Sequence, residues 1–84
     1  MSNEKDIRGW LLQGKENGAT HLIVMCDTFC WEDYPFAIYP RQDIQQEVRL
    51  RQEHSEQNMQ KVMEVYDLSL DIETQLAEDR AWHL

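Results

Sequence analysis

The stretch "THLIVMCDTFCWEDYPFAIYP", residues 20–40, decides the fold because it carries two candidate strands joined by a short connection. The apolar run Leu22–Cys26 is short and contains β-branched residues, which favours a buried strand within residues 20–29 over a helix. Alternation along this strand places Ile23 on one face and Val24 on the other, so both faces are apolar. We therefore expect both faces of the sheet to be covered.

A second short strand follows at "PFAIYP", residues 35–40, where a proline stands at each end. The intervening "CWEDY", residues 30–34, has the length of a hairpin connection. The two strands are therefore predicted to be antiparallel neighbours, with the carboxylates and aromatic rings of residues 30–34 on the loop between them.

Two further segments have the 3.6-residue periodicity of amphipathic helices. Residues 3–17 place Ile7 and Leu11 on one face, and Asn3 begins a candidate N-terminal cap region. Residues 41–57 are polar and carry only a thin apolar stripe. We expect this second helix to lie at the periphery of the domain.

The segment "MQKVMEVYDLSL", residues 59–70, fits either a helix or a strand. A strand is favoured because valine and tyrosine prefer strands and because an isolated hairpin needs a third strand for stability. As a strand, its Met63 and Val65 would face away from Val62 and Tyr66.

The last segment, residues 69–84, is predicted to be a helix capped by Asp71, with its apolar side reaching Leu84. The expected order is α-β-β-α-β-α. This order predicts a small α+β domain spanning residues 1–84, in which helices pack on a three-stranded, mostly antiparallel sheet.

Charge and length restrict the class of partner. The chain has 84 residues, with 16 acidic against 8 basic side chains, a net charge of −8 and a pI near 4.6. This balance disfavours direct binding to nucleic acid and to anionic membrane surfaces, both of which depend on lysine and arginine. A domain this short is often reinforced by association, so we expect a homo-oligomer.

The sequence also bears on the compartment. No segment approaches the roughly 18 apolar residues of a membrane span, and "MSNEKDIRGW" at residues 1–10 lacks the apolar core of a signal peptide. We therefore expect a cytoplasmic protein without a membrane partner. The two cysteines are expected to be free thiols.

Catalytic and metal chemistry have little support in the sequence. Cys26 and Cys30 would lie about 13 Å apart along an extended strand, too far for a disulfide or a shared zinc ion. No histidine is tied to Cys30 by spacing, and the adjacent Glu32 and Asp33 are expected to point into water. We predict no metal, no cofactor and no catalytic residue, and an enzyme is the least favoured class.

Contact residues are better supported, because aromatic rings beside carboxylates on a loop suit a binding surface. Trp31 is the preferred contact residue, and Phe29 and Tyr34 could equally cap the domain's own core. Near the C-terminus, Arg80 stands beside Trp82, a pair able to hold a phosphate and stack a base. The predicted contact residues are Asp27, Cys30, Trp31, Glu32, Asp33, Tyr34, Arg80 and Trp82.

The runs "GATHLIVMCDTFCWEDYP" and "QKVMEVYDLSLDIETQLAEDRAWH" resemble a group of small proteins encoded by bacteria and their phages. The resemblance covers residues 8–40 and 59–83. It implies a short cytoplasmic accessory protein and, by analogy with other short phage proteins, an antagonist of host defence. No activity, cofactor or site residue follows from it.

Three hypotheses follow. The leading one is a non-enzymatic binding protein that sequesters a nucleotide-like signalling molecule between the subunits of a homo-oligomer. The alternative is an acidic protein-interaction inhibitor, or nucleic-acid mimic, that occupies a basic groove of a host protein. The second alternative is a small enzyme that uses the loop at residues 27–33.

Overall fold

The computed structural model describes residues 4–84, so the predicted cap at Asn3 lies outside the described residues. The α+β class and the predicted order of elements are confirmed. The elements are α1 (Glu4–Glu16), β1 (His21–Asp27), β2 (Glu32–Ile38), α2 (Ile44–Glu53), α3 (Ser55–Asn58), β3 (Gln60–Asp67) and α4 (Ile72–Leu76).

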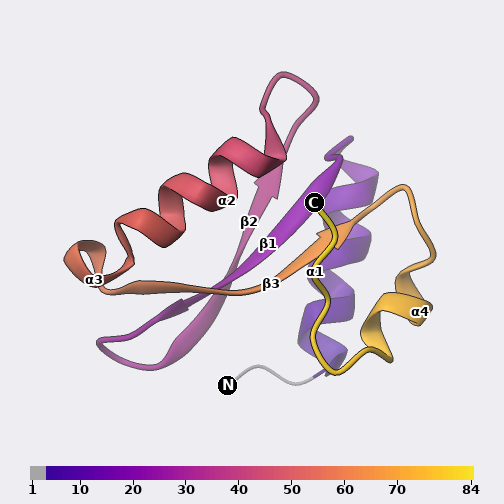
Figure 1. Ribbon diagram of the computed structural model, residues 1–84. Helices are drawn as coiled ribbons and strands as arrows, with labels where there is room; N and C mark the ends of the chain where they lie inside the picture. Colours follow the sequence, from indigo (N-terminus) through magenta and orange to yellow (C-terminus); the bar gives the residue numbers. More distant parts are fainter. Residues whose placement is uncertain (1–3) are drawn as a thin grey trace.

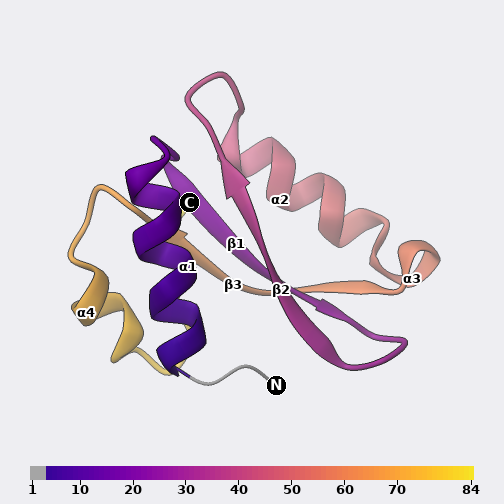
Figure 2. The same cartoon turned by 180° about the vertical axis from the view of Figure 1, so that it is seen from behind.

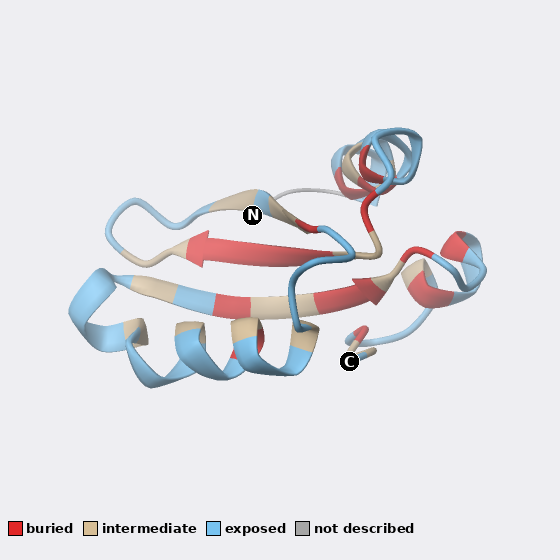
Figure 3. Cartoon of the chain, turned by 90° about the horizontal axis from the view of Figure 1, so that it is seen from above, coloured by how far each residue is buried: buried red, intermediate tan, exposed pale blue. Residues whose placement is uncertain are grey.

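The sheet has three strands in the order β2-β1-β3, and β1 pairs antiparallel with both neighbours (Figures 1 and 2). Seen from above in Figure 3, α1 lies on one side of the sheet and α2 lies on the other. The short α4 lies beside the end of β3 and adds Ile72 to the same core as α1. The prediction that both faces are covered is therefore confirmed.

Each face of the sheet has its own hydrophobic core, and the alternation predicted for β1 is confirmed. Leu22 and Val24 pack under α1 and α4, whereas Ile23 and Met25 pack under α2. The first core also contains Ile7, Leu11, Ala19, Tyr66, Leu68, Ile72 and Ala81, and the second also contains Ile38, Val48, Val62 and Val65.

The strand prediction for residues 59–70 is confirmed by β3, but the predicted alternation is wrong. Val24 pairs with Glu64 and Met25 pairs with Val62, so the register shifts and Met63 is the additional residue of a β-bulge. Because of this extra residue, Val62 and Val65 lie in the same core despite their odd spacing.

The predicted hairpin connection is too long and is placed too late in the chain. The pairing of β1 with β2 continues to Asp27 and Glu32, so the turn occupies only residues 28–31. Pro35 therefore lies within β2 instead of beginning it. The strand tolerates a proline because β2 is at the edge of the sheet, where a missing N–H group need not break the ladder.

The predicted C-terminal helix is also wrong beyond its first turns. α4 ends at Leu76, and the chain then returns to β3, where Val65 forms a parallel bridge with Trp82. The Val65 N–H donates to the carbonyl of Ala81 at 2.9 Å, and the His83 N–H donates to the carbonyl of Val65 at 3.0 Å. These bonds use the outer edge of β3, which a longer helix would leave unpaired.

The predicted helix at residues 41–57 is two shorter helices. Asp43 caps α2, where its carboxylate accepts from the backbone N–H of Gln45 at 3.0 Å. The short α3 ends at Asn58, and the C-cap residue Met59 that follows it has a φ of 54°. A non-glycine residue in this left-handed conformation ends a helix and turns the chain into β3.

Acid should weaken the attachment of α4. The carboxylate of Asp71 accepts from Thr74 Oγ1 at 2.6 Å and from the Thr74 backbone N–H at 2.9 Å. These hydrogen bonds hold the pKa of Asp71 below its ordinary value. The stabilisation is therefore complete above the ordinary aspartate pKa of about 4 and is lost as the pH falls through the lower pKa of the folded state.

Urea unfolding at about pH 7 and about pH 3 checks this expectation. An Asp71→Asn variant keeps an acceptor for the Thr74 N–H but does not titrate, so its free energy of unfolding should fall less on acidification than that of the parent. An equal fall in both proteins would contradict the assignment.

Candidate functional site at the hairpin tip

One end of the sheet carries an exposed apolar patch, which we call the hairpin tip: Phe29, Trp31 and Met59. Their exposed fractions are 77%, 64% and 45%. The two segments that supply them meet where the backbone N–H of Thr28 donates to the carbonyl of Met59 at 2.9 Å. The β1–β2 turn and α3 accordingly lie side by side in both Figure 1 and Figure 2.

The backbone of the hairpin tip is strained. Within residues 4–84, Trp31 and Met59 are the two non-glycine residues with positive φ, at 58° and 54°. For such residues the left-handed conformation costs about 1–2 kcal/mol. Strain of this kind persists where the surrounding structure enforces it, and it clusters at functional sites.

Asp27 enforces the turn. Its Oδ1 accepts from the backbone N–H of Phe29 at 2.8 Å, and its carbonyl accepts from the N–H of Trp31 at 2.6 Å. The predicted contact of Asp27 with a ligand stays a prediction, and within the structure Asp27 has this role inside the turn. The exposed carboxylate that flanks the tip is Glu32, at the first position of β2.

The thiols of this region differ in environment. Cys26 is buried directly across from Asp33, and burial together with Asp33 raises the pKa of the Cys26 thiol. Cys30 is exposed in the turn. The histidine side chains contact groups elsewhere, namely Thr20 for His21, Gln57 for His54 and Glu78 for His83. No pairing of Cys30 with a base therefore emerges among residues 4–84.

Tyr34 belongs to the domain's own core rather than to the loop. It is half-buried on β2 and packs against the core beneath α2. Burial, with a contribution from Asp27, raises the pKa of its hydroxyl. Of the two aromatic side chains that the sequence left undecided, Tyr34 caps the core and Phe29 does not.

Arg80 and Trp82 hold the C-terminal tail against the bulge of β3. Arg80 Nε donates to the carbonyl of Met63 at 2.9 Å and Nη2 donates to that of Val62 at 3.4 Å. The guanidinium lies 4.2 Å from the centre of the Trp82 ring. Trp82 itself packs on the core beneath α2.

The two groups of predicted contact residues do not meet within one chain. The hairpin turn lies beside Gln60, whereas Trp82 lies beside Val65, five positions further along β3. At the rise of a strand this separation is roughly 16 Å.

Phe29 and Met59 belong to the tip but were not among the predicted contact residues. Phe29 was missed because Pro35 was taken as the start of the second strand, which placed the connection at residues 30–34. The turn occupies residues 28–31 and so includes Phe29. No local signal marks Met59, because it reaches the tip only through the pairing of β3 with β1.

No family model, no curated protein and no solved structure matches the chain. Within residues 4–84, no group of three or more histidine, cysteine, aspartate or glutamate side chains is placed to hold a metal ion. None of the helices in that range has the length and apolar character needed to cross a membrane.

Proposed function

We propose that this chain is a non-catalytic binding protein that inserts the hairpin tip into a cleft of a partner protein. The observation that carries the proposal is the tip itself: Phe29 and Trp31 are exposed by 77% and 64% on a turn held in a strained conformation. Exposed aromatic side chains are the groups that dominate binding energy when a partner buries them.

The charge of the chain supports a partner with basic side chains around that cleft. The net charge is −8, and Glu32 is exposed next to Trp31. Opposite charge at the rim of an interface accelerates association and excludes wrong partners. The resemblance to small bacterial and phage proteins makes a bacterial host protein the partner that we propose, with this chain as its inhibitor.

Capture of partners from a bacterial lysate on the immobilised protein tests this function. Bound proteins should be lost with Trp31→Ala, weakened with Glu32→Gln and released between about 0.05 and 0.5 M salt, where screening becomes strong. Leu70→Ala is the control, since Leu70 is 48% exposed and lies outside the tip. Capture that is indifferent to salt and to Trp31 would reject the proposal.

Replacing Trp31 with glycine should raise the stability of the protein and abolish its binding to the partner. Replacing Trp31 with glycine relieves the left-handed strain, so the free energy of unfolding should rise by about 1 kcal/mol. Trp31→Ala keeps the strain and should show no such gain. Both variants should fail to capture the partner, and urea unfolding beside the capture assay separates the two effects. If Trp31→Gly is less stable than Trp31→Ala, the inference that the left-handed backbone at residue 31 is strained would be contradicted.

A second candidate function is the sequestration of a nucleotide-like molecule by a homo-oligomer. It is favoured by a hollow of about 460 Å³ beside β3, where Lys61 and Arg80 bring two cations to its lining. Glu64 and Asp79 also line it, and Arg80 already bonds to the backbone of β3. A thermal-shift screen of linear and cyclic nucleotides, on protein whose oligomeric state is measured by light scattering, tests this candidate. It is rejected if no nucleotide raises the melting temperature of a confirmed oligomer.

A further inference from the structure

The outer edge of β2 is open, whereas the outer edge of β3 is covered by the C-terminal tail. The Val65 N–H donates to the carbonyl of Ala81, and the carbonyl of Val65 accepts from the His83 N–H. Arg80 also donates to two carbonyls of the β3 bulge. Among residues 4–84, no strand pairs with the outer edge of β2, which is the first strand in the order β2-β1-β3.

The direction of each backbone group of β2 follows from the strand pairing, because opposite residues of an antiparallel pair face either toward or away from each other. Both backbone groups of Val65 face the tail, so those of Ile23, opposite Val65, face β2. Phe36 is opposite Ile23, so its backbone groups face β1. Since successive residues of a strand direct these groups to alternate sides, those of Pro35 and Ala37 face the open edge.

The open edge presents few hydrogen-bond donors. Pro35 has no N–H group, and its ring occupies the space into which a neighbouring strand would bring a carbonyl. Tyr39, two residues beyond Ala37, donates its N–H to Gln42 Oε1 at 2.9 Å, and its carbonyl accepts from the Gln42 N–H at 2.9 Å. Over residues 35–39, the Ala37 N–H is therefore the single donor that the edge can offer to another strand.

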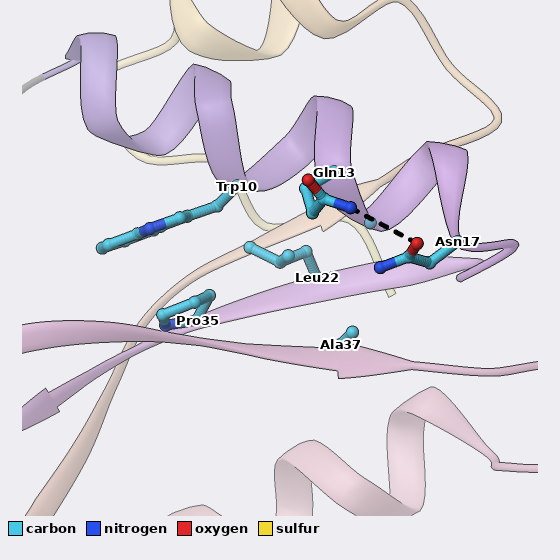
Figure 4. A pocket seen from close by; sticks show the side chains of 7 residues that line it. Trp10, Gln13, Asn17, Leu22, Pro35 and Ala37 are labelled. Carbon is cyan, nitrogen blue, oxygen red and sulfur yellow. Dashed lines mark hydrogen bonds between the residues drawn. The ribbon is translucent and has the colours of Figure 1, made fainter.

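The side chains of this edge favour association. Apart from its two prolines, the run "YPFAIYP", residues 34–40, has the uncharged, aromatic and β-branched composition of strands that pair through their edges. On the face beneath α1, Pro35 and Ala37 border an apolar groove of about 160 Å³ that Trp10 and Leu22 also line (Figure 4). Two copies joined along β2 would therefore bring apolar side chains together.

We infer that Pro35 prevents the β2 strands of two copies from pairing edge to edge. A residue with an N–H group at position 35 would give the edge a second donor, two residues from Ala37, which is the spacing that an antiparallel ladder uses. The net charge of −8 adds repulsion between copies, but salt screens that repulsion and leaves the steric block in place. This inference does not rest on either function proposed above, and a homo-oligomer that sequesters a nucleotide would form through another surface.

Hydrogen exchange of the parent protein tests the direction of the backbone groups. The Ala37 N–H should exchange at least about tenfold faster than the N–H groups of Phe36 and Ile38, which face β1. Equal protection of Ala37 and these two neighbours would overturn the inference, because the Ala37 N–H would then already have a partner.

Restoring the N–H group tests the block itself. In sedimentation equilibrium at about 0.5 M salt, Pro35→Val should self-associate at least about tenfold more tightly than the parent, and protection of its Ala37 N–H should rise with concentration. Pro40→Val is the matched control, because it makes the same change outside β2, and it should sediment as the parent does. The inference is overturned if Pro35→Val associates no more than the parent, or if Pro40→Val associates as strongly. If Pro35→Val is not folded by its NMR spectrum, Pro35→Ala takes its place with the same two outcomes.

Discussion

Replacing Gln75 with leucine is expected to lower the free energy of unfolding by about 2–3 kcal/mol, although the two side chains are similar in size. Gln75 is 2% exposed, and it binds the backbone of Asp67 like a neighbouring strand. Its Oε1 accepts from the Asp67 N–H and its Nε2 donates to the Asp67 carbonyl, both at 2.8 Å. Leucine would leave the N–H group at the end of β3 without this acceptor, and α4 would lose its attachment to the sheet.

Two further variants test whether the loss of stability comes from the buried hydrogen bonds of Gln75. Gln52→Leu removes an exposed amide on α2 and should change the free energy of unfolding by no more than about 0.5 kcal/mol. Gln75→Glu buries a carboxyl group whose neutral form can both donate and accept, so its pKa in the folded state should be raised. That variant should therefore gain stability on mild acidification. Two results would contradict the role of the hydrogen bonds between Gln75 and Asp67. One is a stability of Gln75→Glu that does not change with pH, and the other is an equal free energy of unfolding for Gln75→Leu and Gln52→Leu.

Truncating Trp82 to alanine should cost about 2–3 kcal/mol, somewhat less than truncating a fully buried aromatic side chain. The indole packs on the core beneath α2, and Arg80 lies against its ring while bonding to the β3 bulge. Without the ring, the tail should separate from β3. Hydrogen exchange should then show faster exchange at the N–H groups of Val65 and His83, which bond between tail and strand.

The matched control is Trp31→Ala, the same substitution at a side chain that is 64% exposed. It should change stability little, because it removes few buried contacts and leaves the turn strained. Similar losses in the two variants would show that the tail contributes no more to stability than the exposed tip. If Trp82→Ala loses stability but the Val65 N–H does not exchange faster, the loss comes from the core beneath α2 and not from separation of the tail.

Prediction from the sequence succeeded where the pattern is local. The apolar run Leu22–Cys26 predicted a strand covered on both faces, and the valines after residue 60 predicted the third strand. It failed where the outcome depends on a partner strand. Whether Pro35 begins a strand or lies within it depends on whether that strand is at an edge. Whether Met63 alternates or bulges depends on its register with β1.

The candidate site was also predicted only in part from the sequence. Trp31 was predicted to be the preferred contact residue on the loop, and its side chain is exposed. Phe29 and Met59 were not predicted to join it, since the tip is assembled by the pairing of β3 with β1. Arg80 and Trp82 were placed on a helix near a ligand, but they secure an extended tail. Their contact with a ligand stays a prediction.

By itself, the sequence determined the α+β class, the order of the elements and the net charge of −8, because periodicity, turn residues and composition can be read without knowing which distant residues meet. Only the tertiary structure decided the bulge in β3, the extended tail, the hairpin tip and the groove between α1 and β2. Each of these depends on backbone groups or side chains that lie far apart in the chain and meet only when the sheet forms, so no local pattern records them.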